Sequence, residues 1–285
     1  MSNIVLVGWD FDKVAHDSYT TSILAEYNKA DPAEHVSYLK QRGIFTDTDV
    51  SRWQQDFGGR EIKTISDLAA FMTAGLYEMK KPGSDDPLIS KENVKAGKQY
   101  ILRGATIDDA KRASEGIRYI NGFEAATEAF RKAGLSQSLF SDGMGPMIDH
   151  QRIKHRMTAG GGVPPILDIG GVKTTYSVIH LNSPTAVLTG ETEKYNKIQN
   201  FFNYLIRAKT PLSQVAVIDD SGENVEHLLK PVMEAGGIAI GFNPTKAHTG
   251  QFVKAGIPIL VQEEKSLEPF IDIVQDRRTI GRHCV

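Results

Sequence analysis

The hydrophobic positions of this chain follow two spacings, one typical of buried strands and one typical of helices. Short continuous apolar runs, rich in β-branched side chains, predict buried strands. They lie at residues 4–9, 138–140, 215–218, 238–242 and 257–261. Apolar residues three and four positions apart separate several of them and predict amphipathic helices. Because strands alternate with helices, we expect an α/β fold: a doubly wound parallel sheet with helices on both faces.

One long segment departs from this alternation. Between Asp17 and about Ala113 the strand pattern is absent and helical spacing dominates. Thr64-x-x-Asp67 and Thr106-x-x-Asp109 have the residue types of a capping box, so a helix is expected to start at each. The expected domains are an α/β core of residues 1–16 and 114–285 and a mostly helical insertion of residues 17–113.

Three weaker features complete the expected layout. Residues 81–99 are polar and contain prolines and glycines, so we expect a surface loop. The run Gly160-Gly161-Gly162 predicts a second loop. Residues 176–180 and 185–188 have the pattern of a β-hairpin turned at 182–184.

The composition indicates a globular chain that lacks a strong net charge. Of 285 residues, 40% are hydrophobic and 24% charged, and 33 basic and 35 acidic side chains give a net charge of −2. This balance provides no electrostatic footprint for nucleic acid or an anionic membrane, so neither is expected as a partner. The single cysteine, Cys284, excludes an internal disulfide and a cysteine metal cluster. Without a secretory signal pattern or a long apolar run, we expect a cytoplasmic protein, and the oligomeric state stays open.

Polar side chains follow three of the expected strands at the point where each strand ends. They are Asp10 and Asp12, then Ser141, then Asp219 and Asp220. The carboxyl ends of parallel strands meet at one edge of a sheet, where open α/β folds bind ligands, so these side chains should share a crevice. Carboxylates from two strands form a hard oxygen site suited to Mg2+ and a substrate phosphate. A lysine near the start of the next helix, Lys197 or Lys194, would add the positive charge that phosphoryl transfer uses.

Four motifs carry this chemistry in a fixed order. They are DFDKV at 10–14, LFSDG at 139–143, Lys197, and VIDDSGEN at 217–224 followed by GIAIGFN at 237–243. In this order they resemble the haloacid dehalogenase (HAD) superfamily, and within it the phosphoserine-phosphatase-like group. The resemblance implies a Rossmann-like core with an inserted helical cap domain. It also implies a Mg2+-dependent phosphatase that hydrolyses a small-molecule phosphomonoester through an aspartyl-phosphate intermediate.

The resemblance also implies roles for the residues of the first three motifs. Asp10 would be the nucleophile and Asp12 the general acid and base. Ser141 and Lys197 would bind the phosphate, with Asp142 beside them where phosphoserine phosphatases usually have glycine. Superfamily members that keep an aspartate in the second position are typically phosphatases or phosphomutases. Asp12 therefore argues against carbon–halogen chemistry.

For the metal, the resemblance implies Asp10, Asp220 and the main-chain carbonyl of Asp12 as ligands. Asp219 precedes Asp220 and is a further candidate ligand. Asn224 stands where the group often carries an acid, so the surroundings of the metal stay open.

Two other functions fit part of the pattern. A phospho-acceptor regulatory domain also gathers aspartates, a hydroxyl and a lysine on a parallel sheet, and a catalytically silent small-molecule binding module is possible on the same fold. The inserted helical segment and Asp12 as a second acid favour the phosphatase. His16 lies close enough to Asp10 in the sequence to face the cleft, but we expect it to be a surface histidine.

Overall fold

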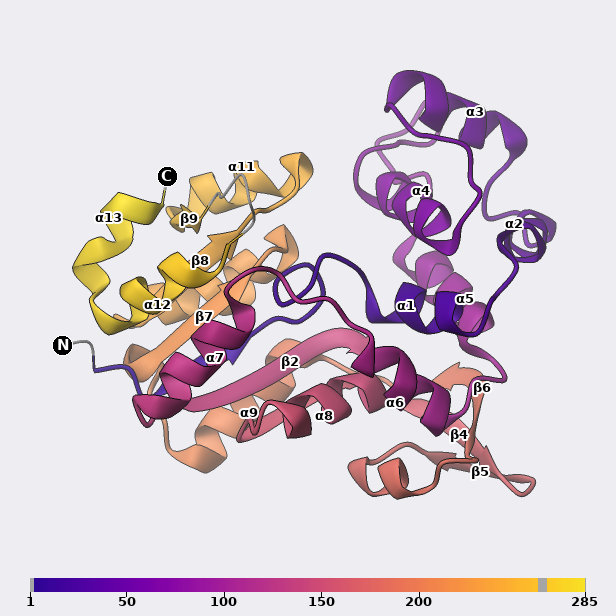
Figure 1. Ribbon diagram of the computed structural model, residues 1–285. Coiled ribbons are helices and arrows are strands. Elements are labelled where there is room, and N and C mark those ends of the chain that lie inside the picture. Colours follow the sequence, from indigo (N-terminus) through magenta and orange to yellow (C-terminus); the bar gives the residue numbers. More distant parts are fainter. Residues whose placement is uncertain (1–2, 261–265, 285) are drawn as a thin grey trace. The chain divides into compact units, whose positions relative to one another are not determined.

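The computed structural model describes residues 3–260 and 266–284, which fall into two compact units (Figure 1). The core unit consists of Met1–Tyr19, Ser114–Pro164 and Lys194–Val285, and the inserted unit consists of Thr20–Ala113 and Pro165–Glu193. The sequence pattern places residues 165–193 in the core, whereas the structure groups them with the inserted helices. Within the described ranges, none of the helices combines the length and apolar character needed to cross a membrane.

The core unit contains a sheet whose paired strands all run parallel. Its strands are β1 Leu6–Trp9, β2 Ser136–Met144, β3 Ala159–Val163, β7 Val215–Asp219, β8 Ile238–Phe242 and β9 Ile259–Leu260. The six strands lie in the order β3-β2-β1-β7-β8-β9. All four residues of β1 are buried, as expected for a central strand covered on both faces. The predicted parallel α/β sheet is confirmed.

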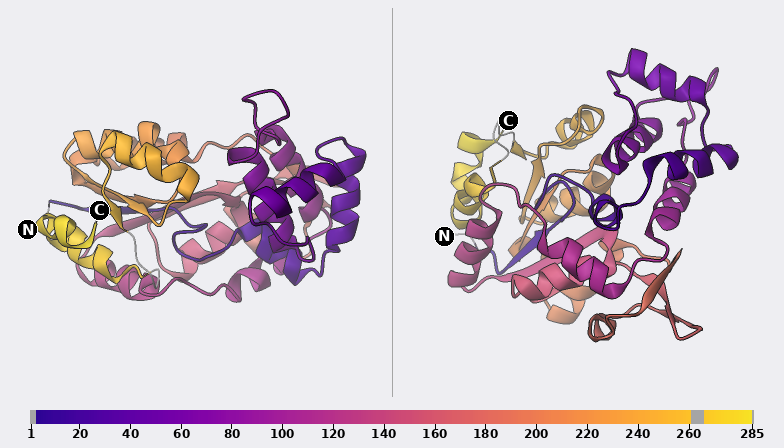
Figure 2. Two further views of the ribbon diagram at one scale, coloured as in Figure 1. Left: turned by 90° about the horizontal axis from the view of Figure 1, so that it is seen from above. Right: turned by 45° about the vertical axis from the view of Figure 1, so that its right-hand side comes forward.

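Helices connect these strands and cover both faces of the sheet (Figure 2). The longer ones are α7 Phe123–Lys132, α8 Gly145–Lys154, α9 Lys197–Ala208, α11 Lys246–Ala255 and α12 Glu268–Gln275. The shorter ones are η2 Leu212–Gln214, η3 Gly222–Asn224, the π-helical turn η4 Val225–Leu229, α10 Lys230–Glu234, η5 Arg277–Thr279 and α13 Ile280–His283.

The two faces of the sheet pack against different helices. On one face the ring of Trp9 lies 5.3 Å from Phe123 of α7 and 5.4 Å from Phe270 of α12, measured between ring centroids. On the other face, Phe201 of α9 and Phe252 of α11 join one buried cluster with residues of β7 and β8. A Cβ on Gly8 would lie 2.9 Å from the ring of Phe201. The glycine therefore lets α9 pack directly onto the backbone of β1, which brings the start of α9 close to the end of β1.

The inserted unit combines helices with a small antiparallel sheet. Its helices are α1 Thr20–Tyr27, α2 Pro32–Gln41, α3 Asp47–Asp56, α4 Ile65–Tyr77, α5 Lys91–Leu102, α6 Ile107–Glu115 (which continues into the core unit) and η1 Val178–Asn182. Its strands are β4 Pro165–Ile169, β5 Val172–Thr175 and β6 Val187–Thr192, in the order β5-β4-β6. Thr64 with Asp67 and Thr106 with Asp109 form the reciprocal hydrogen bonds of a capping box, which confirms both predicted helix starts.

Backbone hydrogen bonds join the two segments of the inserted unit. Gly104 N–H donates to the carbonyl oxygen of Leu188 at 2.8 Å, and Leu188 N–H donates to Ala105 at 2.7 Å. Ile107 N–H donates to Ala186 at 2.9 Å. These bonds explain why residues 165–193 belong with the inserted helices although they lie far from them in the sequence.

Two local predictions inside the inserted unit are wrong. The hairpin is formed by β4 and β5, not by 176–180 and 185–188, because Gly170 and Gly171 have positive φ angles of 64° and 87° and supply the tight turn. The expected loop 81–99 is helical from Lys91 onward, since the hydroxyl of Ser90 accepts the N–H of Asn93 and caps α5.

The third wrong local prediction lies in the core unit. Gly160-Gly161-Gly162 belongs to β3 and not to a loop. A Cβ on Gly160 would lie 2.4 Å from the carbonyl oxygen of Leu139, and one on Gly162 would lie 2.7 Å from that of Gly143. The glycines are needed because β3 lies unusually close to the backbone of β2.

Candidate active site

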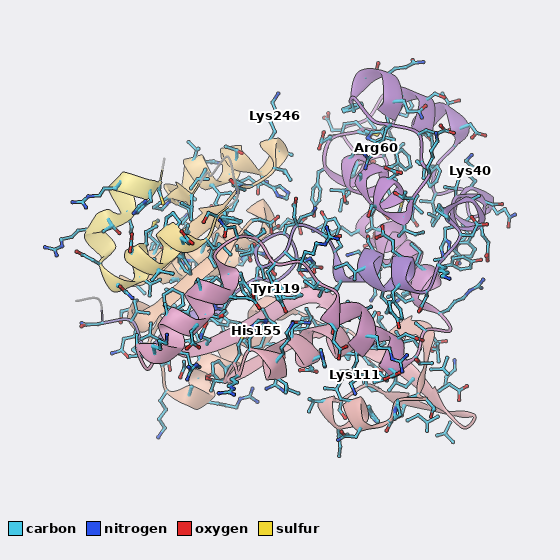
Figure 3. The ribbon with its side chains drawn as sticks, viewed as in Figure 1. Lys40, Arg60, Lys111, Tyr119, His155 and Lys246 are labelled. Atoms are coloured by element: carbon cyan, nitrogen blue, oxygen red, sulfur yellow. The ribbon has the colours of Figure 1, made fainter. Side chains whose placement is uncertain are left out.

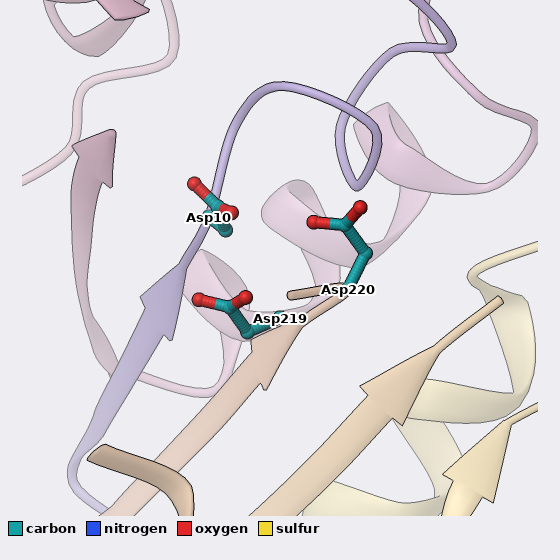
Figure 4. Close-up of side chains that lie close together, drawn as sticks. All are labelled: Asp10, Asp219 and Asp220. Atoms are coloured by element: carbon teal, nitrogen blue, oxygen red, sulfur yellow. The ribbon is translucent and has the colours of Figure 1, made fainter. Parts of the chain in front are cut away.

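The adjacent ends of β1 and β7 bring three carboxylates together (Figure 4). Trp9 is level with Ile218 in the parallel register, so Asp10 and Asp219 follow side by side. The carboxylate oxygens of Asp10, Asp219 and Asp220 lie within 4.8 Å of one another. Over residues 3–260 and 266–284, this is the one group of three or more acidic, histidine or cysteine side chains that meets this spacing.

The side chain of Lys197 reaches this cluster from the first position of α9. Its Nζ lies 2.9 Å from Oδ2 of Asp10 and 3.1 Å from Oδ2 of Asp219, and it is buried. Asn196 fixes the start of the helix, because its side chain accepts the N–H of Gln199 at 2.9 Å. Lys194 is exposed to solvent. Of the two lysines that the sequence leaves open, the structure places Lys197 against Asp10.

The carboxyl groups of the cluster outnumber its single ammonium group. Burial raises the pKa of Asp10 well above its ordinary value, and the nearby Asp219 and Asp220 add to this while Lys197 opposes it. Burial, together with the charge of Asp219, raises the pKa of Asp220 to about 7. Burial acts to lower the pKa of Lys197, but the carboxylates of Asp10 and Asp219 raise it well above its usual range. One ammonium group therefore faces three carboxylates.

This donor set fits a magnesium ion. All three side chains offer carboxylate oxygens, the ligands that Mg2+ prefers. Burial disfavours the charged forms of Asp10 and Asp220. A divalent cation would favour their ionised forms and balance the remaining negative charge.

Asp219 is held by protein donors on both of its oxygens. Ser221 N–H donates to Oδ1 at 2.8 Å, and the side-chain amide of Asn224 lies 3.0 Å from Oδ1 and 2.9 Å from Oδ2. Lys197 completes the set at Oδ2. An acid at position 224 would repel Asp219, whereas Asn224 donates to it. The asparagine therefore orients Asp219, and Asp219 in turn holds Lys197.

Asp12 lies in the turn that follows β1, and its charge contributes to the raised pKa of Asp220. The turn is closed by the N–H of Ala15, which donates to the carbonyl oxygen of Phe11 at 2.9 Å, and Lys13 has a positive φ of 68°. Nε2 of His16 lies 3.0 Å from Oδ1 of Asp12. The expectation of a surface histidine is wrong, since His16 is only 1% exposed.

Ser141 and Asp142 lie near the end of β2. Because Trp9 is level with Leu139 in the parallel register, Ser141 stands one residue beyond the level of Asp10. Ser141 is buried and its hydroxyl accepts the N–H of Gly143 at 3.1 Å. Asp142 is exposed, and its charge contributes to the raised pKa of Lys197, so this carboxylate does lie near the lysine.

Two residues of the site make contacts that the sequence reasoning did not specify, His16 with Asp12 and Asn224 with Asp219. His16 stands four positions after Asp12 and Asn224 stands five positions after Asp219. The spacing of His16 is that of one helical turn, which could have indicated a pair. Only the structure shows that a tight, non-helical turn brings the two side chains together.

The sequence matches no protein-family model and no curated protein sequence. The fold matches solved structures. A phosphoserine phosphatase in apo form has a TM-score of 0.57 and 12% sequence identity, covering 96% of this chain and 98% of that chain. A HAD family hydrolase from Salmonella enterica serovar Typhi has a TM-score of 0.57 and 10% identity, covering 96% of this chain and 72% of that chain.

A third structure is a phospho-aspartyl intermediate analogue of phosphoserine phosphatase, with a TM-score of 0.52 and 13% identity over 87% of this chain and 90% of that chain. These similarities confirm the predicted fold, an α/β core of the kind found in HAD hydrolases and phosphoserine phosphatases. At identities this low the similarity establishes the fold, and the activity is argued from the site.

Proposed function

We propose that this protein is a Mg2+-dependent phosphatase that hydrolyses a small-molecule phosphomonoester through an aspartyl-phosphate on Asp10. The observation that carries the proposal is the contact between the buried Asp10 carboxylate and Lys197, 2.9 Å apart, at the end of the central strand beside Asp219 and Asp220. A carboxylate can attack a phosphate dianion only where positive charge offsets the repulsion. The site provides one positive charge, that of Lys197, and carboxylate ligands for a metal cation that would supply a second.

The reaction would proceed in two displacements. A carboxylate oxygen of Asp10 attacks phosphorus while the bond to the leaving oxygen breaks, and Asp12 donates a proton to that oxygen. Asp12 then takes a proton from water as the water oxygen attacks phosphorus. The bond between Asp10 and phosphorus breaks, and inorganic phosphate leaves. Lys197 and Ser141 would hold the phosphate oxygens in both steps.

Asp10, Asp220 and the main-chain carbonyl of Asp12 would hold the Mg2+ ion. Bound there, the ion would supply the charge compensation that phosphoryl transfer requires. Asp219 already accepts hydrogen bonds from Lys197, Ser221 and Asn224. We therefore assign Asp219 to the orientation of Lys197, not to direct metal binding.

The structural neighbours support the same reaction class. They include a substrate-bound phosphoserine phosphatase, with a TM-score of 0.56 and 12% identity, and the phospho-aspartyl intermediate analogue described above. The inserted unit would act as a cap that restricts the site to small substrates and excludes bulk water, while the single water molecule that attacks phosphorus is admitted.

The first experiment measures turnover of p-nitrophenyl phosphate in excess chelator, with Mg2+ restored, and with Ca2+ in its place. We expect loss of activity on chelation, recovery with Mg2+ and poor recovery with Ca2+, which tolerates looser geometry. Full activity in excess chelator would contradict the metal site. Absence of turnover under all conditions would favour a silent binding module, and one stable phosphorylation without turnover would favour a phospho-acceptor domain.

A second experiment tests the substrate class. The kcat/KM values for a panel of small metabolite phosphates are compared with those for phosphorylated proteins. We expect the best substrate to be a small phosphomonoester. A higher kcat/KM for the phosphoproteins would show that the inserted unit does not restrict access.

A further inference from the structure

The ring of His16 is fixed against the turn that carries Asp12. It is 1% exposed, and its centroid lies 4.6 Å from that of Phe11. The backbone of His16 forms isolated β-bridges with Asp12 and with Tyr119. The next residues on each side are also joined, because Ile120 N–H donates to the carbonyl oxygen of Ala15 at 2.8 Å. The backbone of His16 is therefore held from the side of Tyr119 as well as from Asp12, and its ring packs against Phe11.

The contact between the ring and Asp12 has a defined direction. When Asp12 is ionised its carboxylate can only accept, so in that state Nε2 of His16 carries the hydrogen and donates to Oδ1 over 3.0 Å. The terminal torsion of an aspartate has a broad energy profile, so a hydrogen bond to one carboxylate oxygen narrows the range of its orientations. Because the carboxylate is planar, a hydrogen bond to Oδ1 also fixes the direction of Oδ2.

We propose that His16 is a positioning residue that holds the Asp12 carboxylate in the orientation needed for proton transfer. This inference rests on the proposed phosphatase function. In the first displacement the proton on Asp12 passes to the leaving oxygen as its bond to phosphorus breaks. In the second, a proton passes from water to Asp12 as the new bond to phosphorus forms. His16 touches neither phosphate nor leaving group and acts only through Asp12.

The leaving group provides a readout that a purely structural role would not change. An aryl oxide such as p-nitrophenolate leaves without a proton, whereas the alkoxide of glycerol 2-phosphate needs one. The hydrolysis of the aspartyl-phosphate needs the general base with either substrate. A misoriented Asp12 therefore slows both steps for the alkyl phosphate and only the second step for the aryl phosphate.

The experiment compares His16→Phe, His16→Gln and Asp12→Asn with the wild-type protein in the presence of Mg2+. For His16→Phe, which keeps a ring against Phe11, we expect kcat on glycerol 2-phosphate to fall at least about 10-fold with little change in KM. The upper limit is loss of the whole contribution of general acid–base catalysis, roughly 100- to 10,000-fold. With p-nitrophenyl phosphate we expect a burst of nitrophenolate approaching one equivalent, followed by slow turnover. His16→Gln keeps an N–H donor near the position of Nε2 and should recover most of the loss. Asp12→Asn should show the same pattern as His16→Phe with a larger loss of kcat.

The control is His155→Phe, because His155 is another hydrogen-bonded histidine of the core unit. Its Nε2 lies 2.9 Å from the hydroxyl of Tyr119, beside which it is labelled in Figure 3. It belongs to neither the metal nor the phosphate site, so both substrates should be turned over at the wild-type rate without a burst. Thermal midpoints are recorded for every variant. If His16→Phe does not fold, His16→Asn replaces it, since its shorter amide does not span the distance to Asp12.

Equal losses on both substrates without a burst would overturn the inference and make His16 a structural residue. Unchanged kinetics in a folded His16→Phe or His16→Asn variant would overturn it as well. In both cases wild-type turnover shows that the proposed phosphatase function itself stands. Absence of turnover by the wild-type protein would instead contradict the proposed function, and the inference would fall with it.

Discussion

A chain of hydrogen bonds and ion pairs joins the buried polar side chains around the end of β1. Asn224 holds Asp219, Asp219 holds Lys197, and Lys197 contacts Asp10. Each contact joins a buried charged group to a donor or to an opposite charge. Removing one member leaves a buried group without compensation, which costs more than the contact itself contributes.

The role of Asp10 is tested by Asp10→Asn. The carboxamide has nearly the same volume but lacks the anionic nucleophile and one metal charge. We expect turnover to fall below a few per cent of the wild-type rate, while the far-UV circular dichroism spectrum stays unchanged. Retention of a larger fraction of activity would show that Asp10 is not the nucleophile.

The role of Asn224 is tested by Asn224→Asp. This change replaces two hydrogen-bond donations to Asp219 by the repulsion of two buried carboxylates. We expect the free energy of unfolding in urea without Mg2+ to fall by about 1–3 kcal/mol. Asn203→Asp on the exposed side of α9 is the matched control, with an expected change within about 0.5 kcal/mol. Equal effects of the two substitutions would contradict the orienting role of Asn224.

The sequence predicts the position of these residues to different degrees. Asp10, Asp219 and Asp220 meet because parallel strands that end in carboxylates must place them at one edge, and the order of motifs is sufficient to infer this. The burial of His16 depends on the left-handed backbone of Lys13 and on the pairing of His16 with Tyr119, 103 positions later in the chain. No periodicity of hydrophobic residues encodes such a turn.

At the scale of secondary-structure elements, glycines decide how closely β3 approaches β2. We expect Gly160→Ala to lower the free energy of unfolding by about 1–3 kcal/mol, because its Cβ would lie 2.4 Å from the backbone oxygen of Leu139. Gly250→Ala in α11 is the matched control. Nothing lies within 4 Å of a Cβ there, so the change should raise the free energy of unfolding by about 0.5–1 kcal/mol. Urea denaturation measures both, and the same sign for both would contradict the close approach of β3.

The same glycines explain which elements the sequence could predict. The strands 215–218 and 238–242 and the capping boxes at Thr64 and Thr106 follow local rules, and the structure contains all four. A run of three glycines has a high loop propensity, and only the neighbouring strand makes β3 possible. At such positions the pairing with a neighbouring strand outweighs the loop propensity of the residues.

At the scale of the whole molecule, the inserted unit is built from two segments that are far apart in the sequence. The first segment contains no strand of the core sheet, so its helical hydrophobic pattern shows where it begins and ends. The second, residues 165–193, follows β3 directly and has strands of its own, so its pattern resembles that of the core. The hydrogen bonds between residues 104–107 and 186–188 are among the contacts that reveal where it belongs.

These hydrogen bonds predict that the two segments of the inserted unit open together. In native-state hydrogen exchange of the full-length protein, the amide of Leu188 and the amides of α4 should report free energies of opening within about 1 kcal/mol of each other, as expected for one cooperative unit. A much lower value for Leu188 would mean that residues 165–193 open independently.

Two glycine substitutions in the second segment make this test specific. A Cβ on Gly190 would lie 2.7 Å from the carbonyl oxygen of Gln99 in α5, so Gly190→Ala disturbs the contact between the segments. It should lower the free energy of opening for amides in α4 and α5 as much as for that of Leu188. Gly171 also has a positive φ but has nothing within 4 Å of a Cβ, so Gly171→Ala should affect chiefly the β4–β5 hairpin. If Gly190→Ala left the exchange of α4 unchanged, the inserted unit would consist of two separately stable parts, and residues 165–193 would have to be assigned a role of their own.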